Sequence, residues 1–229
     1  MKYAVYVINL DRSIERMNSF SLQIKRLGCE FQRISAVEGS QLDLSKFLGS
    51  RKNTRYFRTL VKGEIGCYLS HLKALETFIS SSADYGIIFE NDALLVDNFQ
   101  ECLEEILGKH TKDPIWDVLK LDGHKRGLFI YDSLSFGSSL VEFKSIPGLA
   151  TGIIWTREAA KQFVGLHVKS EIARPYDVDI RRAWEYQSRV ITVWPSIVNA
   201  SDKFSGSETT IEARWTYSCL LYTSDAADD

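Results

Sequence analysis

The chain has 229 residues, of which 45% are hydrophobic and 25% are charged, and its formal net charge is −2. This length and composition are typical of one globular domain with a sizeable core. The charge balance argues against nucleic acid as a partner, and no run approaches the roughly 20 apolar residues of a membrane span. The N-terminus has no secretory-signal pattern and the four cysteines have no CxxC spacing. We therefore expect reduced thiols rather than a disulfide framework or a zinc site.

The last eleven residues differ in character from the rest of the chain. Residues 219–229 resemble the translation of a sequencing adapter, and the alternative is a genuine polar tail. We expect this segment to lie outside the fold. The prediction is a single domain over residues 1–218 that lacks its native C-terminus.

The first 37 residues predict a strand, a helix and a second strand. Residues 3–9 form a continuous apolar run, which is typical of a central parallel strand. Residues 13–27 carry apolar side chains at helical spacing, with Ser13 as a candidate N-cap and Gly28 just beyond the C-terminal end. Residues 31–37 alternate as a strand does, so the segment is a βαβ unit.

Residues 38–62 predict a loop, in which five basic residues surround two aromatic residues. This loop is interpreted either as a flap that contacts phosphate or acceptor, or as a solvated loop. From residue 63 to residue 80 the apolar spacing predicts a helix. Because glycine destabilises a helix, Gly63 and Gly66 indicate a close approach of another backbone segment. We expect Cys67 to serve in packing.

The remaining chain alternates strands and helices, which predicts an α/β sheet that is mostly parallel. The expected strands are residues 85–90, 116–122, 148–155 and 190–194, the expected helices are 97–108, 157–166 and a helix that follows the turn at 174–179 and ends near 187, and residues 123–148 are irregular or a hairpin.

Polar side chains stand at the ends of three of these strands: Asn9, Glu90 with Asp92, and Asp122. Because the carboxyl ends of parallel strands meet at one edge, we expect these groups to gather there. Strand alternation places Glu90 and Asp92 on one side and Asn91 on the other. The two carboxylates favour Mg²⁺ or Mn²⁺, and the alternative is a solvated turn. No dinucleotide fingerprint, P-loop or nucleophile elbow is present.

Two further groups of residues suggest a binding site. Arg12 and Arg16 lie one helical turn apart where the first strand meets the first helix, a position that suits an anion. The alternative for Arg16 is an ion pair with a surface acid. Ser70 and His71 interrupt an apolar helix, and His71 is interpreted either as a site residue or as a hydrogen-bonded core residue.

Three motifs together resemble glycosyltransferase family 25, which contains lipopolysaccharide and lipooligosaccharide glycosyltransferases. They are residues 9–16 (Asn-Leu-Asp-Arg-Ser-Ile-Glu-Arg), residues 63–71 (Gly-Glu-Ile-Gly-Cys-Tyr-Leu-Ser-His) and residues 88–93 (Ile-Phe-Glu-Asn-Asp-Ala). The resemblance runs in order from residue 3 to about residue 200. It implies an α/β fold of the GT-A (Rossmann-like) type, a nucleotide-sugar donor such as UDP-galactose, Mn²⁺ or Mg²⁺ as cofactor, and inversion at the anomeric carbon.

The resemblance also implies roles for particular residues. Glu90 and Asp92 match the outer acids of the family's Glu-Asp-Asp metal motif, from which this chain departs at Asn91. The expected general base is Asp179, with Asp177 and Glu64 as alternatives, and both aspartates have helix capping as another interpretation. The expected donor-binding residues are Asn9, Leu10, Arg12, Arg16, Ser70, His71 and Asn91.

The expected function is transfer of a hexose from a UDP-sugar to a lipid-linked oligosaccharide of the lipooligosaccharide or lipopolysaccharide type. We expect the reaction at the cytoplasmic face of the membrane, with peripheral contact to the bilayer. Two alternatives remain open: a metal-dependent phosphohydrolase that uses the same acids, and a non-catalytic protein that binds a sugar or a nucleotide.

Overall fold

The computed structural model describes residues 2–43, 60–123, 128–143, 146, 148–167 and 172–201. Two expectations concern parts of the chain outside these ranges. They are four of the five basic residues around Tyr56 and Phe57, with those two aromatic residues, and the segment 219–229.

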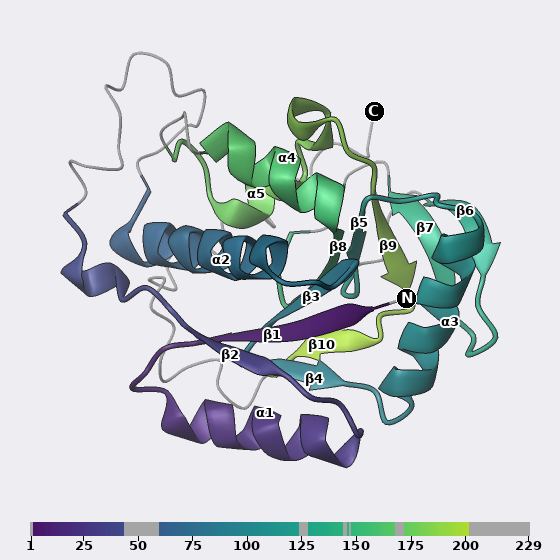
Figure 1. Ribbon diagram of the computed structural model, residues 1–229, viewed down its shortest axis with the longest axis horizontal. Coiled ribbons are helices and arrows are strands. Elements are labelled where there is room, and N and C mark those ends of the chain that lie inside the picture. The colour runs from purple at the N-terminus through teal and green to yellow at the C-terminus, as the bar shows by residue number, and fades with distance from the viewer. Residues whose placement is uncertain are drawn as a thin grey trace, which may run out of the picture.

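A mixed eight-stranded sheet forms the centre of the fold, in the order β2-β1-β3-β8-β5-β9-β7-β6 (Figure 1). The strands β2, β1, β3, β5 and β9 run in one direction, whereas β8 and β7 run antiparallel to them. The α/β prediction is therefore confirmed, with an antiparallel strand, β8, between β3 and β5. The strands are β1 (Tyr3–Asn9), β2 (Gln32–Ser35), β3 (Tyr85–Glu90), β5 (Val118–Lys120), β6 (Leu128–Ser133), β7 (Ser139–Phe143), β8 (Gly152–Thr156) and β9 (Val190–Trp194).

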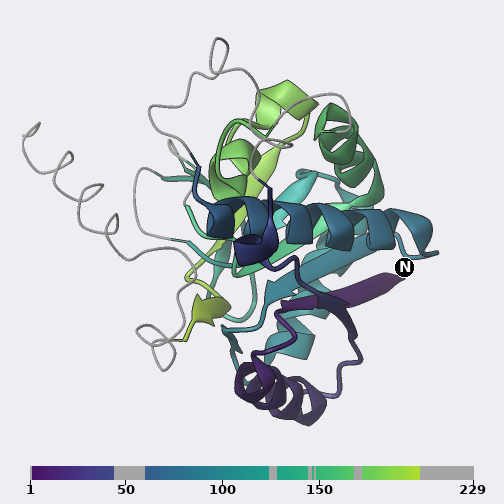
Figure 2. The same ribbon diagram turned by 90° about the vertical axis from the view of Figure 1, so that its left-hand side faces the viewer.

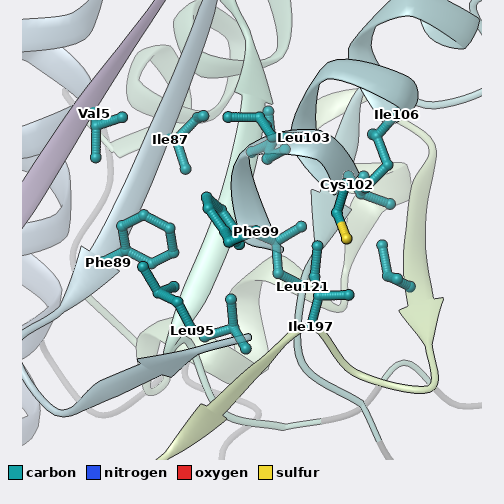
Figure 3. Packing of buried hydrophobic residues seen from close by; sticks show 14 of the residues in the cluster. Val5, Ile87, Phe89, Leu95, Phe99, Cys102, Leu103, Ile106, Leu121 and Ile197 are labelled. Carbon is teal, nitrogen blue, oxygen red and sulfur yellow. The ribbon is translucent and has the colours of Figure 1, made fainter. Parts of the chain in front are cut away.

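Helices cover both faces of this sheet, as Figure 2 shows for α1 and α2 on opposite sides of β1. The side chains of β1 alternate, so that Val5 and Val7 belong to one core cluster and Tyr6 and Ile8 to the other. In the first cluster Phe89 packs against Phe99 (Figure 3). The helices are α1 (Ile14–Arg26) and α3 (Phe99–Lys112) on one face, and α2 (Lys62–Ser80), α4 (Arg157–His167) and α5 (Tyr176–Ile180) on the other.

Two features differ from the sequence prediction. The helix expected to end near residue 187 is instead α5 followed by a 3₁₀ turn, Ala183–Tyr186. The hydroxyl of buried Tyr186 donates to the carbonyl of Ile180, so a side chain takes an acceptor that a continuous helix would use. A small antiparallel sheet of β4 (Ala93–Leu95) and β10 (Val198–Ala200) was not predicted, because three-residue strands carry too little alternation. No helix in the described ranges is both long and apolar enough to cross a membrane.

A glycine contact joins the start of α2 to the loop after β2. A Cβ atom on Gly66 would lie 2.8 Å from the carbonyl oxygen of Val37, and one on Gly39 would lie 2.4 Å from the carbonyl oxygen of Lys62. Neither position has room for a larger residue. The close backbone approach that Gly66 predicted is therefore confirmed, and it brings the 3₁₀ turn Gly39–Gln41 against α2.

Candidate functional site

The predicted edge of the sheet exists, because the ends of β1, β3 and β5 lie side by side at the start of β8. Ile8 pairs with Glu90 in the β1–β3 register, and the Glu90 amide donates to the carbonyl of Thr151 at 3.1 Å. Asp122 also reaches this edge but is buried, and its carboxylate lies 3.4 Å from the ammonium of Lys120. Burial raises the pKa of Asp122.

A cavity of about 490 Å³ opens at this edge, between the N-terminal ends of α1 and α2. Most of the predicted donor and metal residues line it. They are Leu10, Arg12, Arg16, Ser70, His71, Glu90, Asn91 and Asp92.

Asn9 does not line this first cavity, and its contact with the donor stays a prediction. The side chain is buried, accepts a hydrogen bond from the Asn91 amide and donates to the carbonyl of Leu10 at 2.7 Å. Asn9 therefore helps to hold the side chain of Asn91, which lines the cavity. The predicted opposite orientation of Asn91 is also wrong, because β3 ends at Glu90 and residues 91 and 92 form a turn. Glu90, Asn91 and Asp92 all line the cavity.

Basic groups stand on the wall of the first cavity. The Arg12 guanidinium pairs with Glu38, and this hydrogen bond holds the pKa of the Glu38 carboxyl below its usual range. Arg16 lies near Asp92, where its charge favours the ionised carboxylate. Lys62 donates to the carbonyl of Ser40 at 3.2 Å. Lys62 is one of the five basic residues of the loop that was interpreted as a flap for phosphate or acceptor, and it lines this cavity. Glu38 was not singled out from the sequence, although the parallel strand β2 also ends at this edge and the residues after it were a signal.

The carboxylate of Asp92 is buried and only partly hydrogen-bonded. Its Oδ1 atom is buried and has no hydrogen-bond partner among the described residues. Burial, together with the nearby charge of Glu90, raises the pKa of Asp92 to about 6. Because a buried carboxylate without a partner is costly, a cation bound here would offset the cost. The residues Glu90 and Asp92 therefore fit an oxygen-ligated divalent metal.

Glu90 also contacts two side chains of α2. Its Oε1 atom lies 3.2 Å from Nε2 of His71 and 3.8 Å from Sγ of Cys67. Burial pushes the pKa of Glu90 upward, but the hydrogen bond and charge of His71 hold it below its usual value. The His71 ring stacks on Tyr176, with the ring centroids 3.9 Å apart. Cys67 was expected to serve in packing, yet it lines the cavity beside the acid.

A second cavity, of about 230 Å³, adjoins the first and shares Cys67 and Glu90 with it. Its other wall comes from the segment before β8 and from α5, including Leu149, Tyr176 and Asp177. The side chain of Asp177 is about one-third exposed (33%), and its Oδ2 atom lies 3.6 Å from the guanidinium of Arg181.

Asp179, the preferred general base, lines neither cavity. Its carboxylate accepts a hydrogen bond from the Tyr68 hydroxyl at 2.7 Å and pairs with Arg174, and the side chain is buried. Asp177, the alternative base, lines the second cavity. Neither aspartate is the N-cap of α5, because Pro175 occupies that position.

The other two polar residues of the α2 motif have structural contacts. Glu64 lines the second cavity, but its carboxylate accepts the backbone amide of Val61 at 2.9 Å, as a capping residue does. Ser70 donates to the carbonyl of Gly66 at 2.6 Å and accepts from the amide of Val37 at 2.8 Å. Ser70 thus ties the loop after β2 to the helix.

The family model for glycosyltransferase family 25 (LPS biosynthesis protein) matches residues 2–179. The matched span includes the three motifs and the acidic residues that line the two cavities, among them Glu90, Asp92 and Asp177. The chain belongs to glycosyltransferase family 25. The family resemblance expected from the sequence is confirmed.

Two curated relatives in this family come from mosquitoes. A glycosyltransferase 25 family member from Aedes aegypti is 30% identical over 129 residues, which cover 53% of this chain and 21% of the relative. One from Anopheles gambiae is 24% identical over 206 residues, covering 83% of this chain and 35% of the relative. This chain therefore spans only about a fifth to a third of their length. An inactive family member 3 from Mus musculus is 30% identical over 125 residues, covering 51% of this chain and 21% of the relative.

A solved structure with a similar fold is that of S. aureus TarS, residues 1–349. The TM-score is 0.51 at 11% identity, over 88% of this chain and 60% of TarS. At this identity the likeness concerns the fold alone. It agrees with the α/β fold of GT-A type that the sequence predicted.

Proposed function

We propose that this family 25 protein transfers a hexose, galactose first among the candidates, from a UDP-sugar to a lipooligosaccharide or lipopolysaccharide acceptor. The observation that carries the proposal is that two cavities meet at Glu90 and Cys67. A donor in one cavity and an acceptor in the other would bring their reacting atoms together at this junction. With an acceptor of this class, we expect the reaction to take place at the cytoplasmic face of the membrane.

The larger cavity suits the donor. Arg12, Arg16 and Lys62 supply positive charge for a diphosphate, and guanidinium groups bind phosphate through paired hydrogen bonds. Glu90 and Asp92 are the residues that would hold Mn²⁺ or Mg²⁺. When bound, the metal would offset the negative charge that develops on the departing diphosphate.

The smaller cavity suits the acceptor, and Asp177 is the proposed general base. In an inverting transfer the acceptor oxygen forms a bond to the anomeric carbon as the bond from that carbon to the diphosphate oxygen breaks. The acceptor hydroxyl gives its proton to the Asp177 carboxylate in the same step. Glu64 is the less suitable base because its carboxylate already accepts the Val61 amide.

Calorimetric titration with UDP, with and without Mn²⁺, tests the donor part. We expect Mn²⁺ to increase the affinity for UDP at least tenfold. An affinity for UDP that is the same with and without Mn²⁺ would contradict the proposal. A panel of UDP-hexoses with lipooligosaccharide fragments then tests transfer. Water as the only productive acceptor would favour the phosphohydrolase instead.

A second candidate function is binding of a nucleotide or sugar without catalysis. Two observations favour it: the Asn91 amide in place of the central acid of the metal motif, and the similarity to a family member that is named inactive. In that case the calorimetric titration would still show Mn²⁺-dependent UDP binding, while no donor in the panel would be turned over.

A further inference from the structure

Cys67, His71 and Glu90 form a cluster of unlike metal-binding groups at the junction of the cavities. Cys67 and His71 are four residues apart on α2, so they lie on one helix face a single turn apart. Glu90 reaches them from the end of β3. One ligand atom from each lies within 4.8 Å of the other two.

Two of the three separations are close to those of ligands around zinc. Tetrahedral Zn²⁺ with usual bond lengths holds a nitrogen and an oxygen ligand about 3.4 Å apart, and a sulfur and an oxygen ligand about 3.6 Å apart. The corresponding distances here are 3.2 Å for His71 Nε2 to Glu90 Oε1 and 3.8 Å for Cys67 Sγ to the same oxygen. Small side-chain shifts would therefore complete the geometry.

The cluster is both held in position and open on one side. His71 is 1% exposed and its ring is stacked on Tyr176, which limits its orientation. Cys67 and Glu90 line both cavities, so an ion can enter and a fourth ligand can come from water or a bound molecule. Three protein ligands with an open fourth position are typical of an accessible zinc site.

We propose that Cys67, His71 and Glu90 bind a thiophilic divalent cation of the Zn²⁺ class. On binding, the Cys67 thiol releases one proton to solvent and a metal–sulfur bond forms. A sulfur and an imidazole ligand favour Zn²⁺ over Mn²⁺, whereas the carboxylates Glu90 and Asp92 favour the harder ion. The sequence did not indicate this site, because its third ligand comes from another element 19 residues away from His71.

Glu90 belongs to both ligand sets, so the two metals would exclude each other. Bound Zn²⁺ would engage the Glu90 carboxylate that a Mn²⁺ ion beside Asp92 would also use. We therefore expect Zn²⁺ to act as an inhibitor that competes with Mn²⁺. This consequence rests on the proposed function, whereas the site itself does not.

Titration with Co²⁺, which replaces Zn²⁺ and has visible spectra, tests the site directly. We expect one equivalent to produce a thiolate-to-cobalt charge-transfer band and four- or five-coordinate d–d bands, which Zn²⁺ removes. Cys67→Ser should abolish the charge-transfer band and weaken Zn²⁺ binding at least about a hundredfold. The control, Cys29→Ser, replaces a thiol that hydrogen-bonds Gln100 outside both cavities, and it should leave the band intact.

The absence of a charge-transfer band, or a band that persists in Cys67→Ser, would overturn the site. If Cys67→Ser does not fold, Glu90→Gln provides the second variant, with the d–d bands as the readout. A separate titration measures Mn²⁺-dependent UDP binding at increasing Zn²⁺. A Co²⁺ site without any effect of Mn²⁺ on UDP would leave the zinc-class site in place and contradict only the proposed function.

Discussion

Two segments of this protein carry the same acid–x–acid pattern, yet only one has both acids at the candidate site. In residues 90–92, Glu90 and Asp92 both line the larger cavity. In residues 177–179, only Asp177 lines a cavity, whereas Asp179 is buried in contact with Tyr68 and Arg174.

The difference follows from the backbone that carries each pattern. Glu90 ends a strand and Asp92 lies in the turn that follows it, and this turn keeps Glu90, Asn91 and Asp92 at one cavity. Asp177 and Asp179 lie on α5, where two residues correspond to a rotation of about 200° and opposite helix faces. The spacing of acids therefore indicates a shared site only when the secondary structure is known.

Asp177→Asn should give the largest effect on transfer. If Asp177 is the general base, kcat falls by about 10²–10⁴-fold, while Mn²⁺-dependent UDP binding is unchanged. Steady-state kinetics and calorimetry measure the two quantities. The matched variant Glu64→Gln should lower kcat less, and a larger loss in Glu64→Gln would reverse the assignment of the base.

Asp92→Asn tests the acidic pair of the larger cavity, Glu90 and Asp92. Loss of one carboxylate from the proposed metal site should weaken the Mn²⁺-dependent part of UDP binding by about a hundredfold. Calorimetry with Mn²⁺ and UDP measures it. The control is Asp97→Asn, which removes a carboxylate whose side chain is 93% exposed and pairs with Arg26. Equal losses in both variants would show that the effect is not specific to the cavity.

Asp179→Asn should affect folding rather than chemistry. Removing the charge leaves Arg174 with Glu185, at 2.7 Å, as its remaining carboxylate partner, so we expect a loss of about 2 kcal/mol of unfolding free energy. Urea denaturation measures this loss. At temperatures where the variant is folded, its kcat should stay within about threefold of the parent chain, because Asp179 faces neither cavity. A loss of kcat as large as that expected for Asp177→Asn would restore Asp179 as the base.

Most of the fold was predictable because its long elements carry strong periodic patterns. The apolar run of β1 and the helical spacing of α1 gave elements whose bounds agree closely with the structure. Gly66 also predicted a tertiary contact, because glycine destabilises a helix and its presence there indicates a close approach of another backbone segment. The direction of β8 was not predictable, since a buried strand has the same apolar pattern in either direction.

The candidate site was predictable where its residues belong to motifs at strand ends, on the first turn of α1 or on the N-terminal half of α2. Glu90 and Asp92 stand out because their strand end is predicted to meet two other polar strand ends at one edge of the sheet. By contrast, Asn9 was expected to contact the donor, whereas its side-chain oxygen accepts a hydrogen bond from the Asn91 amide. Such a contact joins residues 82 positions apart, and side-chain partners across that distance leave no local pattern in one sequence.

Asn91→Asp tests the centre of the first acidic pattern and should have the smallest effect. The Asn91 amide donates to Oδ1 of Asn9, and a carboxylate would face that oxygen unless the Asn9 amide turned to donate instead. Such a turn would sacrifice the 2.7 Å hydrogen bond from Asn9 to the Leu10 carbonyl. We therefore expect kcat/KM to change by no more than about threefold, because the hydrogen bonds that are lost are offset by a charge-assisted one from the Asn9 amide to the new carboxylate. A gain of a hundredfold or more would instead identify Asn91 as the residue that keeps this chain inactive.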